Sequence, residues 1–91
     1  MNQSNDSIES SGEHEITGEM LEILKIVTFE DRGVEAEYLA NKLGISTPKA
    51  EYYLDELTER NFVHSGVTFG ESALYLVTKE GRKYMFDKGL L

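Results

Sequence analysis

Residues 46–60 hold the side chains best suited to binding chemistry, beginning with Ser46, Thr47, Lys49 and Tyr52. Hydroxyl and ammonium groups donate hydrogen bonds to phosphate oxygens and base edges. An exposed tyrosine ring stacks on a base or sugar, anchors a protein interface, or packs over its own chain. The spacing of the four residues fits the first turns of a helix, so they form one candidate site for nucleic acid or for a partner.

The face of this helix that lies opposite Ala50 is acidic. If Ala50 points to the core, a step of about 100° per residue places Asp55 and Glu59 on the far side. Glu51 and Glu56 flank them. In a DNA groove, carboxylates meet phosphates of the same sign and release no counterions, although one of them can accept from cytosine N4. Three interpretations follow: a solvated face, a surface for a basic partner protein, or DNA contact through the first turn alone.

Enzyme chemistry has little support in the sequence. The two histidines, His14 and His64, are spaced neither as metal ligands nor as a catalytic dyad. There is no cysteine, no serine in a nucleophile motif and no glycine-rich phosphate loop. We therefore predict that the protein is not an enzyme and uses no metal or cofactor. His64 is expected to be a half-exposed strand residue, with a pH-sensing role as the alternative.

The chain has 91 residues, room for one small domain, and a net charge of −8. This charge favours solubility and repels polyanions at long range. Residues 1–14 carry Asp6, Glu9 and Glu13 but no basic residue, so we expect a disordered acidic tail before a domain over residues 15–91. The tail does not resemble a signal peptide, and the apolar runs are too short to span a membrane. We expect a cytoplasmic protein, with which the absence of cysteine is compatible.

Capping residues divide residues 15–91 into helices and strands. Thr17, either Ser46 or Thr47, and Thr78 can each begin a helix. Gly44 can end one in the left-handed conformation, and an asparagine at position 61 tolerates the same conformation. The predicted elements are helices over residues 17–30, 35–43, about 47–60 and 79–88, a short strand at Val34, and strands over residues 62–67 and 73–77.

Apolar residues recur at helical spacing on one stripe of each of the first three helices. The first helix is apolar beyond its stripe, at Leu21, Ile26 and Phe29, which indicates either cover from two sides or a dimer interface. The predicted stripes are Met20, Ile23, Leu24 and Val27; Ala36, Leu39, Ala40 and Leu43; and Ala50, Tyr53, Leu54 and Leu57.

The hairpin loop and the last helix differ in charge. The loop has no basic residue, and Phe69 lies near its tip, where it folds back onto the domain or docks a partner. Positive charge is concentrated in the last helix. These basic residues form a solvated face, a phosphate-contacting patch, or a surface complementary to an acidic surface in a homo-oligomer. The basic residues are Lys79, Arg82, Lys83 and Lys88, and Tyr84, Met85 and Phe86 face inward or line a dimer seam.

The order of elements resembles the winged helix-turn-helix superfamily, of the kind seen in MarR-, ArsR- and PadR-like bacterial regulators. The similar segments are residues 38–40 (YLA), 43–46 (LGIS), 59–63 (ERNFV) and 76–82 (LVTKEGR). The resemblance covers roughly residues 17–89. It implies a mainly helical α+β fold with a three-helix core, an antiparallel wing of two to three strands and a C-terminal helix.

The resemblance further implies a small DNA-binding transcription regulator that forms a homodimer through its first and last helices. However, Glu51 and Tyr52 stand where many members of the superfamily carry Arg, Ser or Thr. The alternative is a protein-interaction module whose acidic helix docks a basic partner and does not read DNA. The residues predicted to contact duplex DNA or that partner are Ser46, Thr47, Lys49, Glu51, Tyr52, Asp55, Glu56 and Phe69.

Overall fold

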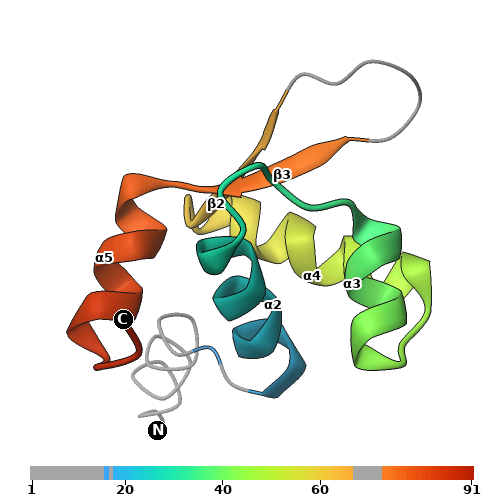
Figure 1. The fold of residues 1–91 in the computed structure, drawn as a ribbon, viewed down its shortest axis with the longest axis horizontal. Helices are drawn as coiled ribbons and strands as arrows, with labels where there is room; N and C mark the ends of the chain where they lie inside the picture. The colour runs from blue at the N-terminus through green and yellow to red at the C-terminus, as the bar shows by residue number, and fades with distance from the viewer. Residues whose placement is uncertain (1–15, 17, 67–72) are drawn as a thin grey trace, which may run out of the picture.

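A central helix organises the fold in the computed structural model, which describes residue 16 and residues 18–66 and 73–91 (Figure 1). This helix, α2, packs against the other three helices and against β3. The predicted disordered tail over residues 1–14 and the predicted cap Thr17 lie outside the described residues. The elements are α2 (Gly18–Phe29), α3 (Ala36–Leu43), α4 (Thr47–Glu59), β2 (Val63–Gly66), β3 (Leu74–Val77) and α5 (Lys79–Asp87).

The wing is an antiparallel hairpin with a third, single-residue partner. Strands β2 and β3 pair from Val63 with Val77 to Gly66 with Leu74. The predicted short strand at Val34 forms one bridge, in which its backbone N–H donates to Tyr75 at 3.0 Å and its carbonyl accepts from Tyr75 at 2.8 Å. Strand β3 therefore lies between β2 and Val34, two residues before the beginning of α3.

The helices begin close to their predicted capping residues. Of the two candidates for α4, Ser46 is the cap, because its Oγ accepts from the backbone N–H of Lys49 at 3.2 Å. Thr78 caps α5 in the same way, accepting from Gly81 at 2.9 Å. Helix α3 begins one residue later than predicted, since Glu35 is extended and serves as its N-cap residue.

The ends of α3 and α4 lie just before the residues that were predicted to adopt the left-handed conformation. Gly44 ends α3 with a φ of 69°, and Asn61 has a φ of 64° directly after the turn that closes α4. Glycine adopts this left-handed region at little cost, and asparagine does so more readily than other residues because its side chain can hydrogen-bond locally. At the ends that can be compared, the predicted helices extend one residue beyond Phe29, Glu59 and Asp87, and the predicted strands begin one residue before Val63 and Leu74. Differences of this size are common because helix ends fray.

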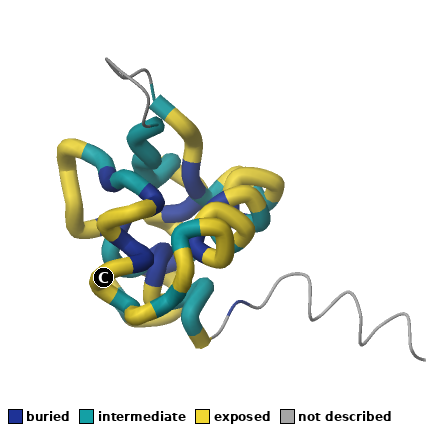
Figure 2. The backbone as a smooth tube through the Cα atoms, turned by 90° about the vertical axis from the view of Figure 1, so that its right-hand side faces the viewer, coloured by how far each residue is buried: buried dark blue, intermediate teal, exposed yellow. Residues whose placement is uncertain are grey.

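The three predicted stripes meet in one hydrophobic core (Figure 2). Leu24 of α2, Leu39 of α3 and Leu54 of α4 are fully buried, and β2 contributes Val63. Burying side chains of this size stabilises the fold by about 1.5–3 kcal/mol each. The remaining buried apolar residues are Ile16, Ile23, Val27, Val34, Ala36, Ala40, Ala50, Leu57 and Met85, with Met20, Leu43 and Tyr53 partly buried against them.

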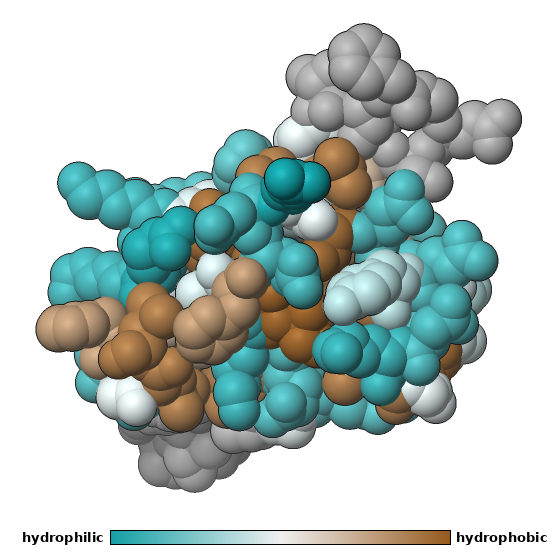
Figure 3. Space-filling model, in the orientation of Figure 1, coloured by the Kyte–Doolittle hydropathy of each residue, from teal (hydrophilic) through white to brown (hydrophobic). Residues whose placement is uncertain are grey.

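The extra apolar residues of α2 and α5 divide between the core and the surface. Leu21 and Ile26 pack against the core, but Phe29 is 62% exposed. On α5, Met85 is buried whereas Phe86 is 69% exposed, so Phe86 does not face inward. Figure 3 shows apolar side chains gathered over the C-terminal end of α5. In the described part of the chain, no helix is both long and apolar enough to cross a membrane.

Candidate nucleic-acid interface

The first turn of α4 is exposed and free of carboxylates. Ser46 and Lys49 are exposed, and Thr47 between them is half-buried. The beginning of a helix carries a partial positive charge from its unpaired N–H groups, which attracts anions. This turn therefore combines hydroxyl groups, an ammonium group and the positive end of the helix dipole.

Lys49 does not extend freely into solvent, because Glu19 at the beginning of α2 holds it. The Lys49 Nζ lies 3.2 Å from Glu19 Oε1, and the Tyr53 hydroxyl donates to the same oxygen at 2.8 Å. These two groups hold the pKa of Glu19 below its usual value, with the Tyr53 hydrogen bond as the larger cause. The same carboxylate raises the pKa of Lys49 and that of Tyr53.

The acidic face of α4 lies where the helical spacing predicts. Glu51, Asp55 and Glu59 are exposed, and Tyr52 among them is 58% exposed. The Tyr52 ring contacts that of Tyr53, with centroids 5.7 Å apart and planes tilted by 58°. An aromatic ring with this exposure, surrounded by carboxylates, is suited to a cationic or aromatic group of a partner.

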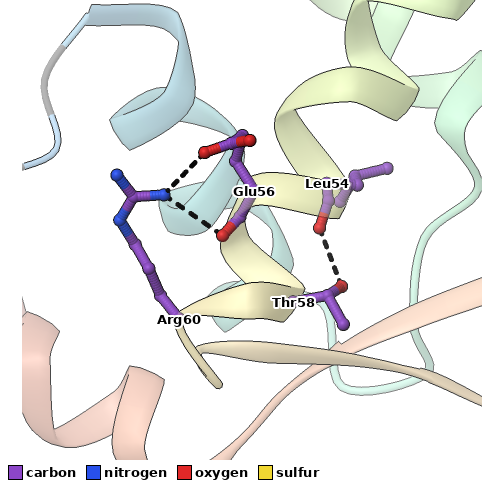
Figure 4. A network of polar contacts seen from close by, with 4 residues as sticks. All are labelled: Leu54, Glu56, Thr58 and Arg60. Carbon is purple, nitrogen blue, oxygen red and sulfur yellow. Dashed lines mark hydrogen bonds and ion pairs between the residues drawn. The ribbon is translucent and has the colours of Figure 1, made fainter. Parts of the chain in front are cut away.

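Glu56 differs from the other carboxylates of the helix because it has an intrahelical partner (Figure 4). Arg60 Nη1 donates to Glu56 Oε1 at 3.1 Å and to the Glu56 carbonyl at 3.2 Å. Both side chains are less than one-third exposed. The two cations of the segment from Ser46 to Arg60, Lys49 and Arg60, are therefore both paired with carboxylates of their own chain.

A hollow of about 270 Å³ lies beside the acidic face, between α3, α4 and β3. Burial raises the pKa of Tyr75 on β3, and the nearby carboxylates of Asp55 and Glu51 raise it further. Tyr75 was not among the predicted site residues, because its position beside α4 depends on the pairing of β3 with Val34. The hollow is lined by Glu35, Ala36, Glu37, Thr47, Glu51, Ala73 and Tyr75.

The basic residues of α5 and His64 of β2 lie on elements other than α4. Phe69 lies outside the described residues. On α5, Lys83 pairs with Asp87 at 2.8 Å, and Lys88 lies 5.6 Å from the centroid of the Tyr84 ring. The described residues contain no group of three or more His, Asp or Glu side chains that could hold a metal ion. His64, predicted to be half-exposed, is exposed on β2.

The fold matches solved structures, although no protein-family model and no curated protein sequence matches the chain. Staphylococcus aureus MepR, in complex with DNA, gives a TM-score of 0.77 at 16% identity, covering 94% of this chain and 72% of that one. A MarR-family transcriptional regulator from Rhodococcus sp. RHA1 gives 0.74 at 23% identity, covering 84% and 54%.

Lactococcus lactis ZitR, in complex with DNA, gives a TM-score of 0.70 at 18% identity, and the match covers 82% of this chain and 51% of ZitR. The chain thus spans about half the length of ZitR. At these identities the matches establish the fold. The protein is a winged helix-turn-helix, with α3 and α4 as its helix-turn-helix and β2 and β3 as its wing.

Proposed function

We propose that this protein binds duplex DNA as a cytoplasmic transcription regulator, with the beginning of α4 in the major groove. The observation that carries the proposal is the exposed first turn of α4, which presents Ser46, Thr47 and Lys49 without a carboxylate. In helix-turn-helix proteins the N-terminal residues of the second helix contact base edges. Two solved structures with this fold, MepR and ZitR, are DNA complexes.

In this arrangement each residue of the first turns has a distinct role. Ser46 and Thr47 hydrogen-bond phosphate oxygens, and Lys49 neutralises one phosphate. Tyr52 contacts a sugar or a base through its ring. Asp55 and the other carboxylates further along α4 remain outside the groove, where their repulsion of phosphates is screened by salt.

Dimerisation through the first and last helices is part of the same proposal. It is supported by exposed apolar side chains on α2, on α5 and in the segment after α5, namely Phe29, Phe86 and Leu91. A two-fold symmetric dimer presents two copies of α4 to half-sites about 34 Å apart, one turn of the double helix. Burial of these side chains between two copies would remove them from water, which favours association.

A second function is favoured by the acidic surface itself. Glu51 and Asp55 surround Tyr52 on α4, and the adjoining hollow adds Glu35 and Glu37. This surface fits a basic segment of a partner protein, whose lysine or arginine side chains pair with the carboxylates. In that case the fold serves for docking and does not read DNA.

Binding of a labelled duplex, followed by fluorescence anisotropy, tests the DNA-binding function. We expect binding at about 50 mM salt that weakens as salt rises, with a log–log slope of about −0.9 for each phosphate neutralised. Lys49→Ala should weaken binding to all sequences. It should also reduce the magnitude of the log–log slope by about 0.9 for each copy of the chain, which corresponds to one lost phosphate contact. Lys83→Ala is the matched control: it also removes one ion-paired lysine, but from α5 instead of α4, so it should have a smaller effect.

The two functions give opposite results in this assay. A folded protein that shows no duplex binding at low salt contradicts the DNA-binding function. The docking function instead requires that an arginine-rich peptide binds and that Tyr52→Ala abolishes its binding. Circular dichroism of the variant should remain that of the wild type, because Tyr52 is exposed.

A further inference from the structure

We propose that Glu19 competes with DNA phosphate for Lys49 and thereby limits the affinity of α4 for DNA. This inference rests on the proposed DNA-binding function. It adds that Glu19, a residue of α2, lowers the affinity with which α4 binds DNA. Glu19 belongs to the first turn of α2, whereas Lys49 and Tyr53 lie one helical turn apart on α4. The competing carboxylate therefore comes from outside the DNA-reading helix.

The geometry shows that the carboxylate is fixed in place. One oxygen, Oε1 of Glu19, accepts from the Tyr53 hydroxyl at 2.8 Å and lies 3.2 Å from Lys49 Nζ. Tyr53 packs against the hydrophobic core, so its hydroxyl is held by a partly buried ring. Glu19 is consequently oriented toward Lys49 by a group that does not itself carry charge.

The charge distribution along α4 makes this single pair important. The other cation of the segment, Arg60, follows the opposite end of the helix and is paired with Glu56. Neutralisation of a phosphate by the exposed first turn thus depends on the ammonium group of Lys49, which must exchange Glu19 for the phosphate. The Lys49 and Glu19 side chains are 51% and 39% exposed, so the exchange requires no unfolding.

The expected effect is modest because exposed ion pairs are weak. Breaking such a pair changes an equilibrium by no more than about fivefold. For each copy of α4 that contacts the duplex, we expect Glu19→Gln to tighten binding about threefold to fivefold at low salt. Glu22→Gln is the matched control: it removes the same charge from the same helix, but Glu22 pairs with Lys25 of α2 at 3.5 Å. The control should tighten binding much less.

A second variant separates the effect of the length of the Glu19 side chain from the effect of its charge. Glu19→Asp keeps the negative charge but shortens the side chain by one methylene group, which weakens both contacts of Oε1. It should also tighten binding, by less than Glu19→Gln. In the background of Lys49→Ala, neither change at position 19 should have an effect beyond that of Glu22→Gln, because the competing partner has been removed.

Anisotropy titrations of the full chain and these variants with one duplex decide the question, after circular dichroism has shown that each is folded. The inference is overturned, and DNA binding stands, if Glu19→Gln binds no tighter than Glu22→Gln or if its gain persists without Lys49. If neither the wild type nor Glu19→Gln binds duplex at the lowest salt, the proposed function and the inference are overturned together.

Discussion

Replacing Gly81 with alanine tests how closely α5 approaches the segment that leads into β2. An alanine Cβ would lie 2.9 Å from Val77 Cγ2 and 3.0 Å from the carbonyl carbon of Phe62, and nearer still to the Phe62 oxygen. That oxygen accepts from the backbone N–H of Thr78 at 2.9 Å. The backbone therefore cannot move away without disturbing the residue that caps α5.

The magnitude follows from two opposing effects. In a helix interior, alanine is normally favoured over glycine by about 1 kcal/mol. Overpacking of a buried site costs about 1–3 kcal/mol and sometimes more, and a backbone neighbour cannot change rotamer to relieve it. Because the nearest neighbour is backbone, we take the upper part of this range, about 2–3 kcal/mol. After the gain of about 1 kcal/mol, Gly81→Ala should lower the free energy of unfolding by about 1–2 kcal/mol, which in a domain of this size lowers the Tm by roughly 4–16 °C.

Urea unfolding followed by circular dichroism measures this difference directly. Arg82→Ala is the control from the neighbouring, exposed position of α5, and it should change the free energy of unfolding by no more than about 0.5 kcal/mol. An unchanged or increased stability of Gly81→Ala would show that the intrinsic preference for alanine prevails and that α5 lies further from Phe62 than described.

Three further predictions concern individual side chains. Asn61→Ala should destabilise the protein by about 1 kcal/mol, because alanine lacks the side-chain hydrogen bonding that makes a positive φ less costly for asparagine. Asn61→Gly should be close to neutral, and thermal unfolding of the two variants tests the difference. Ser46→Ala should cost about 0.5–2 kcal/mol in urea unfolding by removing the α4 cap, whereas Ser65→Ala, at an exposed strand position, should have little effect. Because the pKa of Glu19 is lower when folded, its contribution is present above the ordinary glutamate pKa and is lost as the pH falls through the folded value. The stability difference between wild type and Glu19→Gln should therefore disappear on acidification, and a difference that grows at low pH would contradict this assignment.

Local sequence signals account for most of the fold. Caps such as Ser46 and Thr78, the left-handed positions Gly44 and Asn61, and the apolar stripes each depend on residues within one or two turns of one another. The winged helix-turn-helix could therefore be predicted, including the short strand at Val34 but not its pairing with Tyr75. The exposure of Phe86 was less predictable. Tyr84, Met85 and Phe86 are three consecutive apolar or aromatic residues, and the sequence does not show which of them the buried face of the helix includes.

The candidate interface was only partly predictable. Helical spacing placed Tyr52 and Asp55 on the exposed face of α4, as observed. It could not show that Lys49 is paired with Glu19, since the two lie on different helices and their contact depends on how α2 and α4 cross. The position of Tyr75 beside the acidic face depends in the same way on which strand pairs with which.

The bridge between Val34 and Tyr75 has a mechanical consequence. Its two hydrogen bonds tie β3 to the residue two positions before the beginning of α3. A load applied to the hairpin is thus transmitted along the backbone into the helix-turn-helix, without depending on side-chain contacts. The inclination of the wing relative to α4 therefore depends on two backbone connections, the one over residues 30–35 and the one over residues 60–62 between α4 and β2.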